Sequence, residues 1–194
     1  MTGVLPSQRL RALIGSGAIS SQTKFVEGQI QPASLDLRLG SVAYRVRASF
    51  LAGHGAKVAD RLEEFEMHRV DLTQGAVLEK GAVYVVPLME HLALPAGVSA
   101  VANAKSSTGR LDLLTRLITD GGSEFDRIAE GYHGPLYAEV CPKSFSVLVR
   151  AGQRLNQIRF RQGQAVLSDA ELTALHAAEP LVSGQALISE GLGF

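Results

Sequence analysis

The ten residues Gln31-Pro32-Ala33-Ser34-Leu35-Asp36-Leu37-Arg38-Leu39-Gly40 carry the clearest fold signal in the chain. From residue 34 to residue 39 the hydrophobic period is two, which places the three leucines on one face of an extended chain and Asp36 and Arg38 on the other. This alternation predicts a half-buried β-strand, with the leucines in the core and the polar face in solvent.

Further strand-like pieces follow along the chain, and turn residues such as Gly and Pro separate nearly all of them. Strands are predicted at residues 42–46, 70–72, 83–88, 98–102, 136–140, 146–149 and 157–160. Many short strands with few helices indicate a mainly β fold, a distorted barrel or jelly roll.

Helix signals stand at the two ends. Pro6-Ser7 resembles an N-cap before apolar residues at helical spacing, which predicts a short helix ending near Gly15. Ser168-Asp169-Ala170-Glu171 is a capping box that predicts a helix to about Ala177. The polar segment 50–68 is weakly periodic and is predicted as a long loop or an inserted helix around 61–65.

Composition limits the class of protein. The 194 residues, of which 46% are hydrophobic, suffice for one core plus an appendage. Nineteen basic and nineteen acidic side chains balance, so nothing in the net charge indicates a nucleic acid polymer or a membrane as partner. The chain shows no bilayer-length apolar run and no signal peptide, which predicts a cytoplasmic protein. Its single cysteine, Cys141, excludes the two-cysteine zinc site of metal-dependent nucleobase deaminases.

A first candidate site is Lys105-Ser106-Ser107-Thr108-Gly109-Arg110, which packs hydroxyls, two cations and a glycine into six residues. Hydroxyls and backbone amides cradle phosphate well, and arginine binds its oxygens bidentately. The same residues are also ordinary for a polar helix start, and the glycine spacing is not that of a Walker loop.

A second candidate site is residues 131–139, Gly-Tyr-His-Gly-Pro-Leu-Tyr-Ala-Glu, which places a lone acid, Glu139, on an apolar strand. A carboxyl in such a setting can serve as a general base, although a single strand glutamate is usually a solvated surface residue. Gln157 can read the edge of a base through its amide or simply bond within its strand. His54, His68, His91 and His176 lack metal-ligand spacing and are interpreted as structural or surface residues.

Taken in order, Gln31 to Gly40, Lys105 to Arg110, Gly131 to Glu139 and Asn156-Gln157 resemble the dCTP deaminase family, which belongs with the dUTPases. The resemblance runs from about residue 5 to residue 163. It implies a distorted β-barrel, a homotrimer with active sites between subunits, a deoxycytidine nucleotide as substrate, and Mg²⁺ bound through the nucleotide triphosphate, without zinc.

The resemblance also implies roles for single residues. Glu139 corresponds to the catalytic glutamate that activates water against C4 of cytosine, and Ser106 and Arg110 to the residues that position this water. Lys105 and Ser107 fall at triphosphate contacts. Gln157 and Tyr132 fall among the residues expected to bind the nucleotide.

Three departures from the family pattern stand out. Residues 127–131 read Arg-Ile-Ala-Glu-Gly where the family has Arg-Ile-Asp-Pro-Gly, so that Ala129 replaces an aspartate. A dUTPase keeps its water-activating acid at that position, which argues against diphosphate hydrolysis unless Asp126 or Glu130 compensates. Residues 120–125 depart from the expected base-binding loop, and Lys105 replaces an arginine, whose planar fork it cannot reproduce.

The local sequence, including Lys105 to Arg110 and Phe125 to Glu139, also resembles the first copy in a longer branch of these deaminases, which carries two copies of the fold. Residues 1–163 are then the deaminase-like domain. Residues 164–194 are its C-terminal helix and tail, a linker toward a second copy that starts with the strand-like Gly191–Phe194. Three functions follow from the sequence: dCTP deamination, dUTP pyrophosphohydrolysis, and a non-catalytic module that binds nucleotide or completes an assembly.

Overall fold

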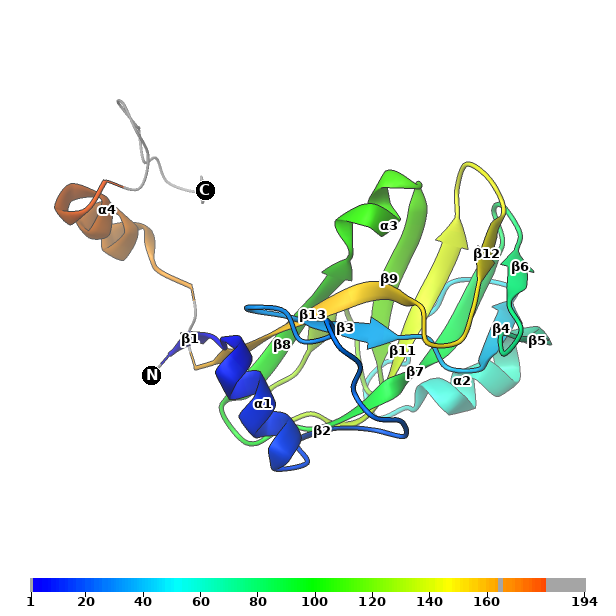
Figure 1. Ribbon diagram of the computed structural model, residues 1–194, viewed down its shortest axis with the longest axis horizontal. Coiled ribbons are helices and arrows are strands. Elements are labelled where there is room, and N and C mark those ends of the chain that lie inside the picture. The colour runs from blue at the N-terminus through cyan, green and yellow to red at the C-terminus, as the bar shows by residue number, and fades with distance from the viewer. Residues whose placement is uncertain (1, 164–165, 181–194) are drawn as a thin grey trace.

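The computed structural model describes residues 2–163 and 166–180 of the chain and is mainly β, as predicted (Figure 1). Its strands form a five-stranded, a six-stranded and a two-stranded sheet rather than one closed barrel. No described helix is long and apolar enough to cross a membrane.

The five-stranded sheet runs in the order β1 (Gly3–Val4), β13 (Arg154–Gln162), β8 (Val98–Ala104) and β10 (Arg127–Ile128), with β3 (Leu35–Arg38) also paired to β13. All of its pairings are antiparallel. This sheet holds two of the predicted motifs, because Gln157 of β13 lies opposite Asp36 of β3.

The six-stranded sheet runs β5 (Glu66–Asp71), β4 (Val42–Val46), β7 (Val83–Ala93), β11 (His133–Pro142) and β9 (Leu113–Thr119), with β2 (Ile19–Ser21) on β7. The two-stranded sheet pairs β12 (Val147–Val149) with β6 (Ala76–Leu78). All seven additional predicted strands are found, several of them longer than predicted. The described strands β1, β2, β6, β9 and β10 carry no clear signal in the sequence.

The helices are α1 (Ser7–Gly15), α2 (Val58–Phe65), α3 (Ser106–Arg110) and α4 (Asp169–Ala178). Both terminal helix predictions are confirmed, including the capping box of Ser168 and Glu171, although Pro6 alone is the N-cap of α1. Segment 50–68 contains α2, which settles the open choice in favour of a helix. Helix α4 has no buried residue and stands apart from the sheets in Figure 1. Gly191–Phe194 lies outside the described residues.

The stretch Gln31–Gly40 joins the two large sheets. Strand β3 pairs with β13 in one sheet, and Leu39 bridges to Leu88 of β7 in the other. Gly40 donates its N–H to the Pro87 carbonyl at 2.8 Å, and a Cβ at this position would lie 2.6 Å from that oxygen. The close approach of the two backbones therefore requires glycine.

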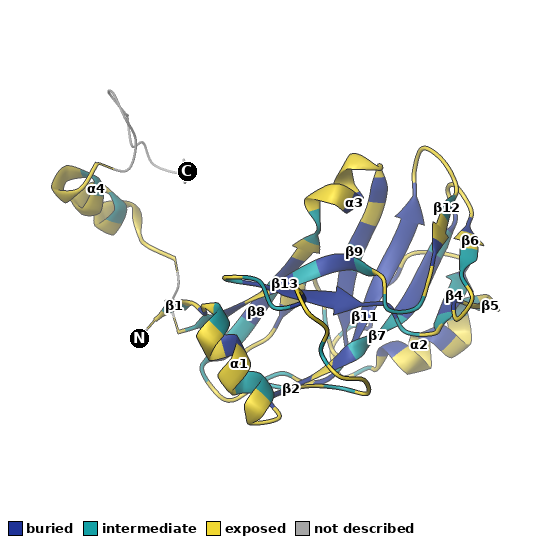
Figure 2. Cartoon of the chain, in the orientation of Figure 1, coloured by how far each residue is buried: buried dark blue, intermediate teal, exposed yellow. Residues whose placement is uncertain are grey.

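The prediction that β3 has one solvated face is wrong. All four residues of β3 are buried, with Asp36 at 0% and Arg38 at 3% exposure (Figure 2). The alternation reports two different buried surroundings: the leucines enter the apolar core, while Asp36 and Arg38 enter polar networks. A buried charge persists only when it is paired and hydrogen-bonded, and both residues have such partners.

A hydrophobic cluster covers one face of the six-stranded sheet and determines the surroundings of Glu139. Val58 and Leu62 of α2 pack with Val85, Ile118 and Tyr137 of three neighbouring strands. Since side chains alternate along a strand, Glu139 lies on the same face as Tyr137, two residues along β11. Helix α2 and the segment before it therefore cover the sheet face on which the candidate base is found.

Candidate active site

Glu139 is held in the middle of β11, opposite Arg116 of β9 and Val85 of β7. It is 1% exposed. Arg116 donates to its Oε1 from Nη2 at 2.5 Å and from Nε at 3.1 Å, and the Ser49 hydroxyl donates to its Oε2 at 2.5 Å. The expectation of a lone acid is thus wrong, because the carboxylate is ion-paired and both of its oxygens accept hydrogen bonds.

Arg116 is fixed on its other side by an aromatic ring. Its guanidinium carbon lies 3.6 Å from the centre of the Phe125 ring, a stacking arrangement that favours arginine over lysine. Asp126 follows directly and accepts a hydrogen bond from the Leu117 N–H at 2.7 Å. Burial raises the pKa of the Asp126 carboxyl, with the Leu117 bond and Arg116 acting against this and Glu139 adding to it.

Neither Arg116 nor Ser49 carries a recognisable signal in the sequence. Arg116 interrupts an apolar run, and it meets Glu139 through strand pairing between residues 23 positions apart. Ser49 lies 90 positions from Glu139, in the segment that follows β4. The pairing register of β9 with β11 would have located Arg116, whereas nothing local points to Ser49.

Lys105 lines a cleft of about 570 Å³ at the end of β8, together with Ser34, Ser106, Gln157 and Arg159. The ammonium group of Lys105 is ion-paired with Oδ2 of the buried Asp36. Gln157 accepts a hydrogen bond from the Ser34 hydroxyl at 3.3 Å. The cleft therefore brings together two of the predicted substrate-binding residues, Lys105 and Gln157, with Ser106, which was predicted to position the water.

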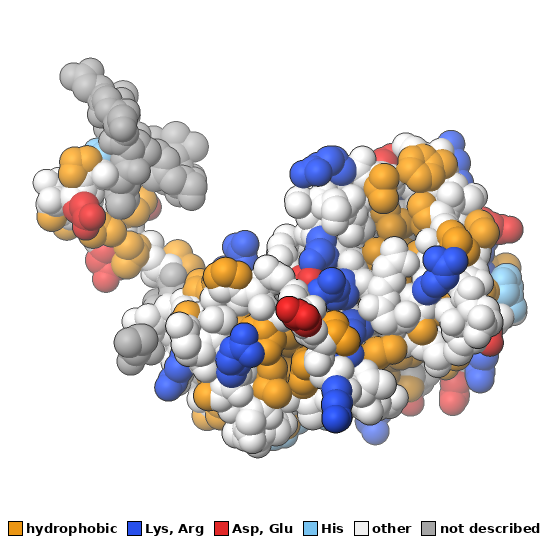
Figure 3. All heavy atoms as spheres, in the orientation of Figure 1, with side chains coloured by type: hydrophobic (Ala, Val, Ile, Leu, Met, Phe, Trp, Pro, Cys, Tyr) orange, Lys and Arg blue, Asp and Glu red, His pale blue; other side chains and the backbone are white. Residues whose placement is uncertain are grey.

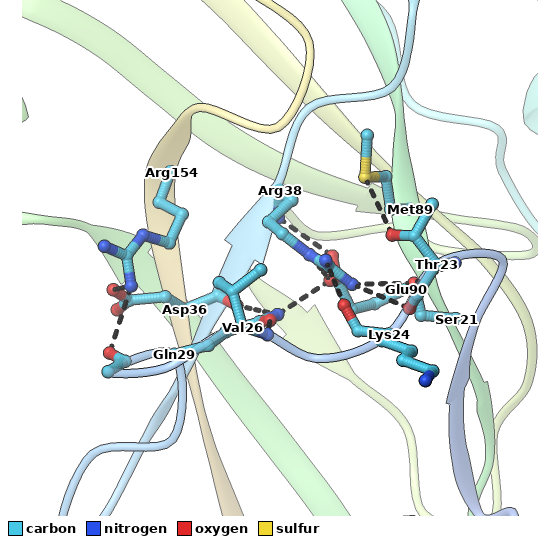
Figure 4. Close-up of polar contacts among 11 residues, drawn as sticks. Ser21, Thr23, Lys24, Val26, Gln29, Asp36, Arg38, Met89, Glu90 and Arg154 are labelled. Atoms are coloured by element: carbon cyan, nitrogen blue, oxygen red, sulfur yellow. Dashed lines mark hydrogen bonds and ion pairs between the residues drawn. The ribbon is translucent and has the colours of Figure 1, made fainter.

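Asp36 itself is incompletely satisfied. Arg154 lies 3.4 Å from its Oδ2, and Figure 4 shows the guanidinium turned toward the carboxylate. Its Oδ1 is buried and has no hydrogen-bond partner among the described residues. A buried acceptor left unpaired costs free energy, so this carboxylate anchors Lys105 without being neutralised on both oxygens.

Arg38, which follows two residues after Asp36 on β3, belongs to a different hydrogen-bond network (Figure 4). Its Nε and its backbone N–H bind the two oxygens of Glu90 at 2.8 Å, and Gln29 donates to the same carboxylate at 2.8 Å. The two remaining guanidinium nitrogens donate to the Ser21 hydroxyl and to backbone carbonyls of residues 23 and 24, just after β2. With side-chain exposures of 4% for Arg38 and 0% for Glu90, this ion pair is almost completely removed from solvent and connects β3 to β7.

The short helix α3 carries the other predicted residues of the first motif. Ser106, Ser107 and Arg110 are exposed, and their side chains form no hydrogen bond or ion pair with any part of the chain that the structure describes. In Figure 3, Lys and Arg side chains gather on the visible face between α3 and β13. The chain alone does not bring Ser106 or Arg110 to Glu139.

A second cleft, of about 480 Å³, adjoins the turn after β9 and is lined by Asp120, Ala129, Glu130, Tyr132 and Arg161, among others. The Tyr132 hydroxyl donates to the Pro135 carbonyl at 2.7 Å and accepts from the Asp120 N–H at 3.2 Å, and burial raises its pKa. Of the two acids near Ala129, Glu130 accepts from the Gly97 N–H at 2.7 Å. Asp126 is likewise engaged with the backbone.

The family model for the 2'-deoxycytidine 5'-triphosphate deaminase (DCD) N-terminal domain matches residues 1–164 of the chain. A crystal structure of 2'-deoxycytidine 5'-triphosphate deaminase from Agrobacterium tumefaciens is similar, with 56% identity and a TM-score of 0.88 over 95% of this chain. The match covers 55% of that chain, so the present chain spans about half the length of this relative.

Two curated relatives, both named dCTP deaminase, dUMP-forming, are more distant. The protein from Beutenbergia cavernae is 28% identical over 158 residues, which is 81% of this chain and 78% of the relative. The protein from Parafrankia sp. is 31% identical over 112 residues, 58% of this chain and 55% of the relative.

Proposed function

The chain belongs to the dCTP deaminase family through its N-terminal domain, and on this premise we propose that it catalyses the hydrolytic deamination of dCTP to dUTP and ammonia. The observation that carries the proposal is Glu139, a carboxylate 1% exposed on an apolar strand yet paired with a cation and a hydroxyl. Such an arrangement keeps a buried group chemically competent for proton transfer.

In the proposed reaction Glu139 accepts a proton from water while the water oxygen forms a bond to C4 of cytosine. Glu139 passes that proton to N3, which completes the tetrahedral intermediate, and then moves the proton of the new C4 hydroxyl to the amino nitrogen. The C4–N bond breaks, ammonia leaves and the C4 carbonyl of uracil forms. One carboxylate is sufficient for these transfers, because each time it first receives a proton and then gives it up. Ser106 and Arg110 are proposed to position the water and stabilise the charge that develops in the intermediate.

The triphosphate is proposed to lie at the Lys105 cleft, against Lys105 and the nearby Ser107. Gln157 is proposed to contact the nucleotide from the same cleft, and Tyr132 from the second cleft. Mg²⁺ is placed on the triphosphate oxygens, where it would offset phosphate charge during binding. In the described residues no group of three or more His, Cys, Asp or Glu side chains is placed to hold a metal ion. Phosphate oxygens suit this cation, which prefers oxygen ligands and retains several waters.

A homotrimer with shared sites is part of the same proposal. Ser106 and Arg110 are exposed and make no contact with Glu139 within the described chain, so a second copy is proposed to bring them there. Coexpression of Glu139→Gln with Ser106→Ala tests this sharing. Random mixing of two inactive chains in a closed assembly restores about a quarter of the sites, each with both intact residues. Sites contained in one chain would stay inactive in the mixture.

The experiment that tests the reaction is incubation with dCTP or dUTP and Mg²⁺, assayed in parallel for ammonia and pyrophosphate. Ammonia from dCTP without pyrophosphate supports the proposal, and Glu139→Gln should abolish it while nucleotide binding persists. Glu66→Gln is the matched control, because Glu66 pairs with Arg69 on the surface of another strand. Wild-type turnover in Glu139→Gln would show that another group activates the water.

A second candidate is conversion of dCTP to dUMP, which the names of the two curated relatives favour. It requires a further acid for diphosphate hydrolysis. Ala129 supplies none, and the neighbouring carboxylates of Asp126 and Glu130 each accept a backbone N–H. Release of pyrophosphate together with ammonia would establish this candidate, and dCTP binding without turnover would instead indicate a non-catalytic module.

A further inference from the structure

We propose that Arg116 and Ser49 are positioning residues, which together hold the Glu139 carboxylate in the orientation that its proton transfers require. The inference rests on the proposed function, which assigns those transfers to Glu139. The three side chains form a closed ring. Arg116 donates to Glu139 Oε1 and to the Ser49 hydroxyl, at 2.5 and 3.1 Å from Nη2, and that hydroxyl donates to Glu139 Oε2 at 2.5 Å.

Charge and burial explain why Glu139 needs these partners. Its side chain is 2% exposed, whereas that of Arg116 is 31% exposed. A carboxylate removed from water keeps its charge only beside a cation and hydrogen-bond donors, and no other cation in the described chain lies within ion-pair distance. Arg116 therefore holds one oxygen from the solvent side, and Ser49 holds the other.

Arg116 is itself held rigidly enough to act in this way. Strand pairing places it directly opposite Glu139, and the Phe125 ring covers its guanidinium at 3.6 Å. Two of its nitrogens converge on the same carboxylate oxygen. The Phe125 ring and the pairing of β9 with β11 fix the planar guanidinium. It therefore defines the direction of the carboxylate, which a flexible ammonium group does not.

Ser49 is positioned by the segment that connects β4 to α2, residues 47–57. This segment is tied to the turn after β9: Gly53 N–H donates to the Gly122 carbonyl at 3.0 Å, and Gly121 N–H to the Ala56 carbonyl at 2.8 Å. The first residue of α2 adds a third bond, from Val58 N–H to Asp120 Oδ1 at 2.8 Å. The turn 120–122 and the carboxylate are thus linked through one covering segment.

In this hydrogen-bonded cluster of Arg116, Ser49 and Glu139, the two carboxylate oxygens have different partners. Oε1 carries both guanidinium contacts and stays with Arg116. Oε2 faces a hydroxyl, which can rotate and accept instead of donate once the carboxylate has taken a proton from water. We therefore place proton uptake and return on Oε2, with Ser49 adjusting its hydrogen bond at each transfer while Arg116 keeps the group in place.

The test compares kcat and KM for ammonia release from dCTP in wild type, Arg116→Gln, Arg116→Lys and Ser49→Ala. Arg116→Gln is expected to lower kcat about 100-fold and to change KM by less than about threefold, since it removes a group that acts through Glu139. Arg116→Lys should recover about tenfold of that loss, and Ser49→Ala should lower kcat about tenfold. Arg69→Gln, a surface strand arginine, is the matched control.

Two outcomes overturn the inference. One is wild-type kcat in Arg116→Gln at equal folded fraction. The other is a loss of activity that only follows the loss of folded protein, with no recovery in Arg116→Lys, because a purely structural ion pair would behave in this way. The double variant Ser49→Ala/Arg116→Gln should resemble Arg116→Gln alone, since residues acting as one unit are not additive.

A second measurement separates this inference from the proposed function. Glu139 is labelled with a water-soluble carbodiimide and an amine, and its modification is followed by mass spectrometry in the same proteins. Faster labelling of Glu139 in Arg116→Gln and Ser49→Ala than in wild type supports the positioning of the Glu139 carboxylate by these two residues. If wild type releases no ammonia, the proposed function fails. Equal labelling in all three proteins then overturns the positioning role as well, and faster labelling in the variants retains it.

Discussion

Two glutamates of the six-stranded sheet, Glu90 on β7 and Glu139 on β11, are each 1% exposed and each paired with an arginine. They differ in what surrounds the arginine. Arg38, the partner of Glu90, has a side chain that is 4% exposed and hydrogen-bonds on every nitrogen, whereas Arg116 is 31% exposed. The two acids are equally buried, but solvent reaches the arginine partner of Glu139 far more than that of Glu90.

This difference separates a structural pair from a candidate catalytic one. The Glu90 network is closed by Gln29 and by loop backbone, so that no part of it can move without unpairing a buried charge. The Glu139 cluster instead ends on Arg116 and on Ser49, which is exposed and lies in a connecting segment. A site that exchanges protons with a substrate needs a partner that can adjust, and only the second arrangement has one.

The largest expected effect is on the Glu90 network. Arg38→Met leaves the Glu90 carboxylate buried without its cation, which should lower the free energy of unfolding by about 3–5 kcal/mol. Urea denaturation followed by circular dichroism measures this change. Arg69→Met, in the exposed pair with Glu66, is the control and should leave the midpoint unchanged. Equal midpoints for Arg38→Met and wild type would remove the structural role assigned to the network.

A smaller loss of stability is expected at Glu139. Glu139→Gln keeps an acceptor and a donor near Ser49, and the partly exposed Arg116 can be hydrated, so the free energy of unfolding should fall by only about 1–2 kcal/mol. Glu90→Gln, measured alongside by the same urea titration, should cost more because Arg38 has no access to water. Equal costs for the two variants would contradict the distinction between the sites.

Asp36 lies between these two cases, since its partner Lys105 borders a cleft. Lys105→Met should lower the free energy of unfolding by about 1 kcal/mol, because Arg154 stays within 3.4 Å of the carboxylate. If Lys105 also contacts phosphate, the KM for dCTP should rise about tenfold. Lys105→Arg is the control and should preserve both values. An unchanged KM in Lys105→Met would remove Lys105 from the triphosphate site.

The elements that the sequence predicted well are those whose signals are local. The capping box at Ser168 and the strand at residues 42–46 each depend on neighbours within a few positions, and both are found as predicted. The burial of Asp36 and Arg38 was not predictable, because alternation shows which residues share a face without showing what covers it.

The candidate site was predictable in its motifs and not in its connections. Glu139, Lys105 and Gln157 stand out by residue type and by family resemblance, but Arg116 and Ser49 reach Glu139 through pairing and loop contacts 23 and 90 positions apart. Such contacts depend on register and on the path of a connecting segment, and neither leaves a pattern in the residues themselves.

The smallest expected effect concerns Asp126, beside the Glu139 cluster. Burial raises the pKa of its carboxyl above the ordinary 3.8, so the folded chain binds this proton more tightly than the unfolded chain does. Its contribution to stability is therefore complete below about pH 3.8 and is lost as the pH rises through the folded pKa. Asp126→Asn removes this loss, and its neutral amide oxygen can still accept from the Leu117 N–H.

Asparagine also suits the backbone at this position, because φ is +63° and asparagine tolerates the left-handed region better than most residues. Relative to wild type, the variant should gain stability as the pH rises above about 3.8, by less than about 1 kcal/mol, in urea titrations at several pH values. Asp71→Asn is a control of opposite sign. Bonds from Thr73 lower the pKa of Asp71, so that variant should be the less stable one at neutral pH and approach wild type on acidification. If both variants drift in the same direction, the pH dependence arises from general charge and not from the surroundings of Asp126.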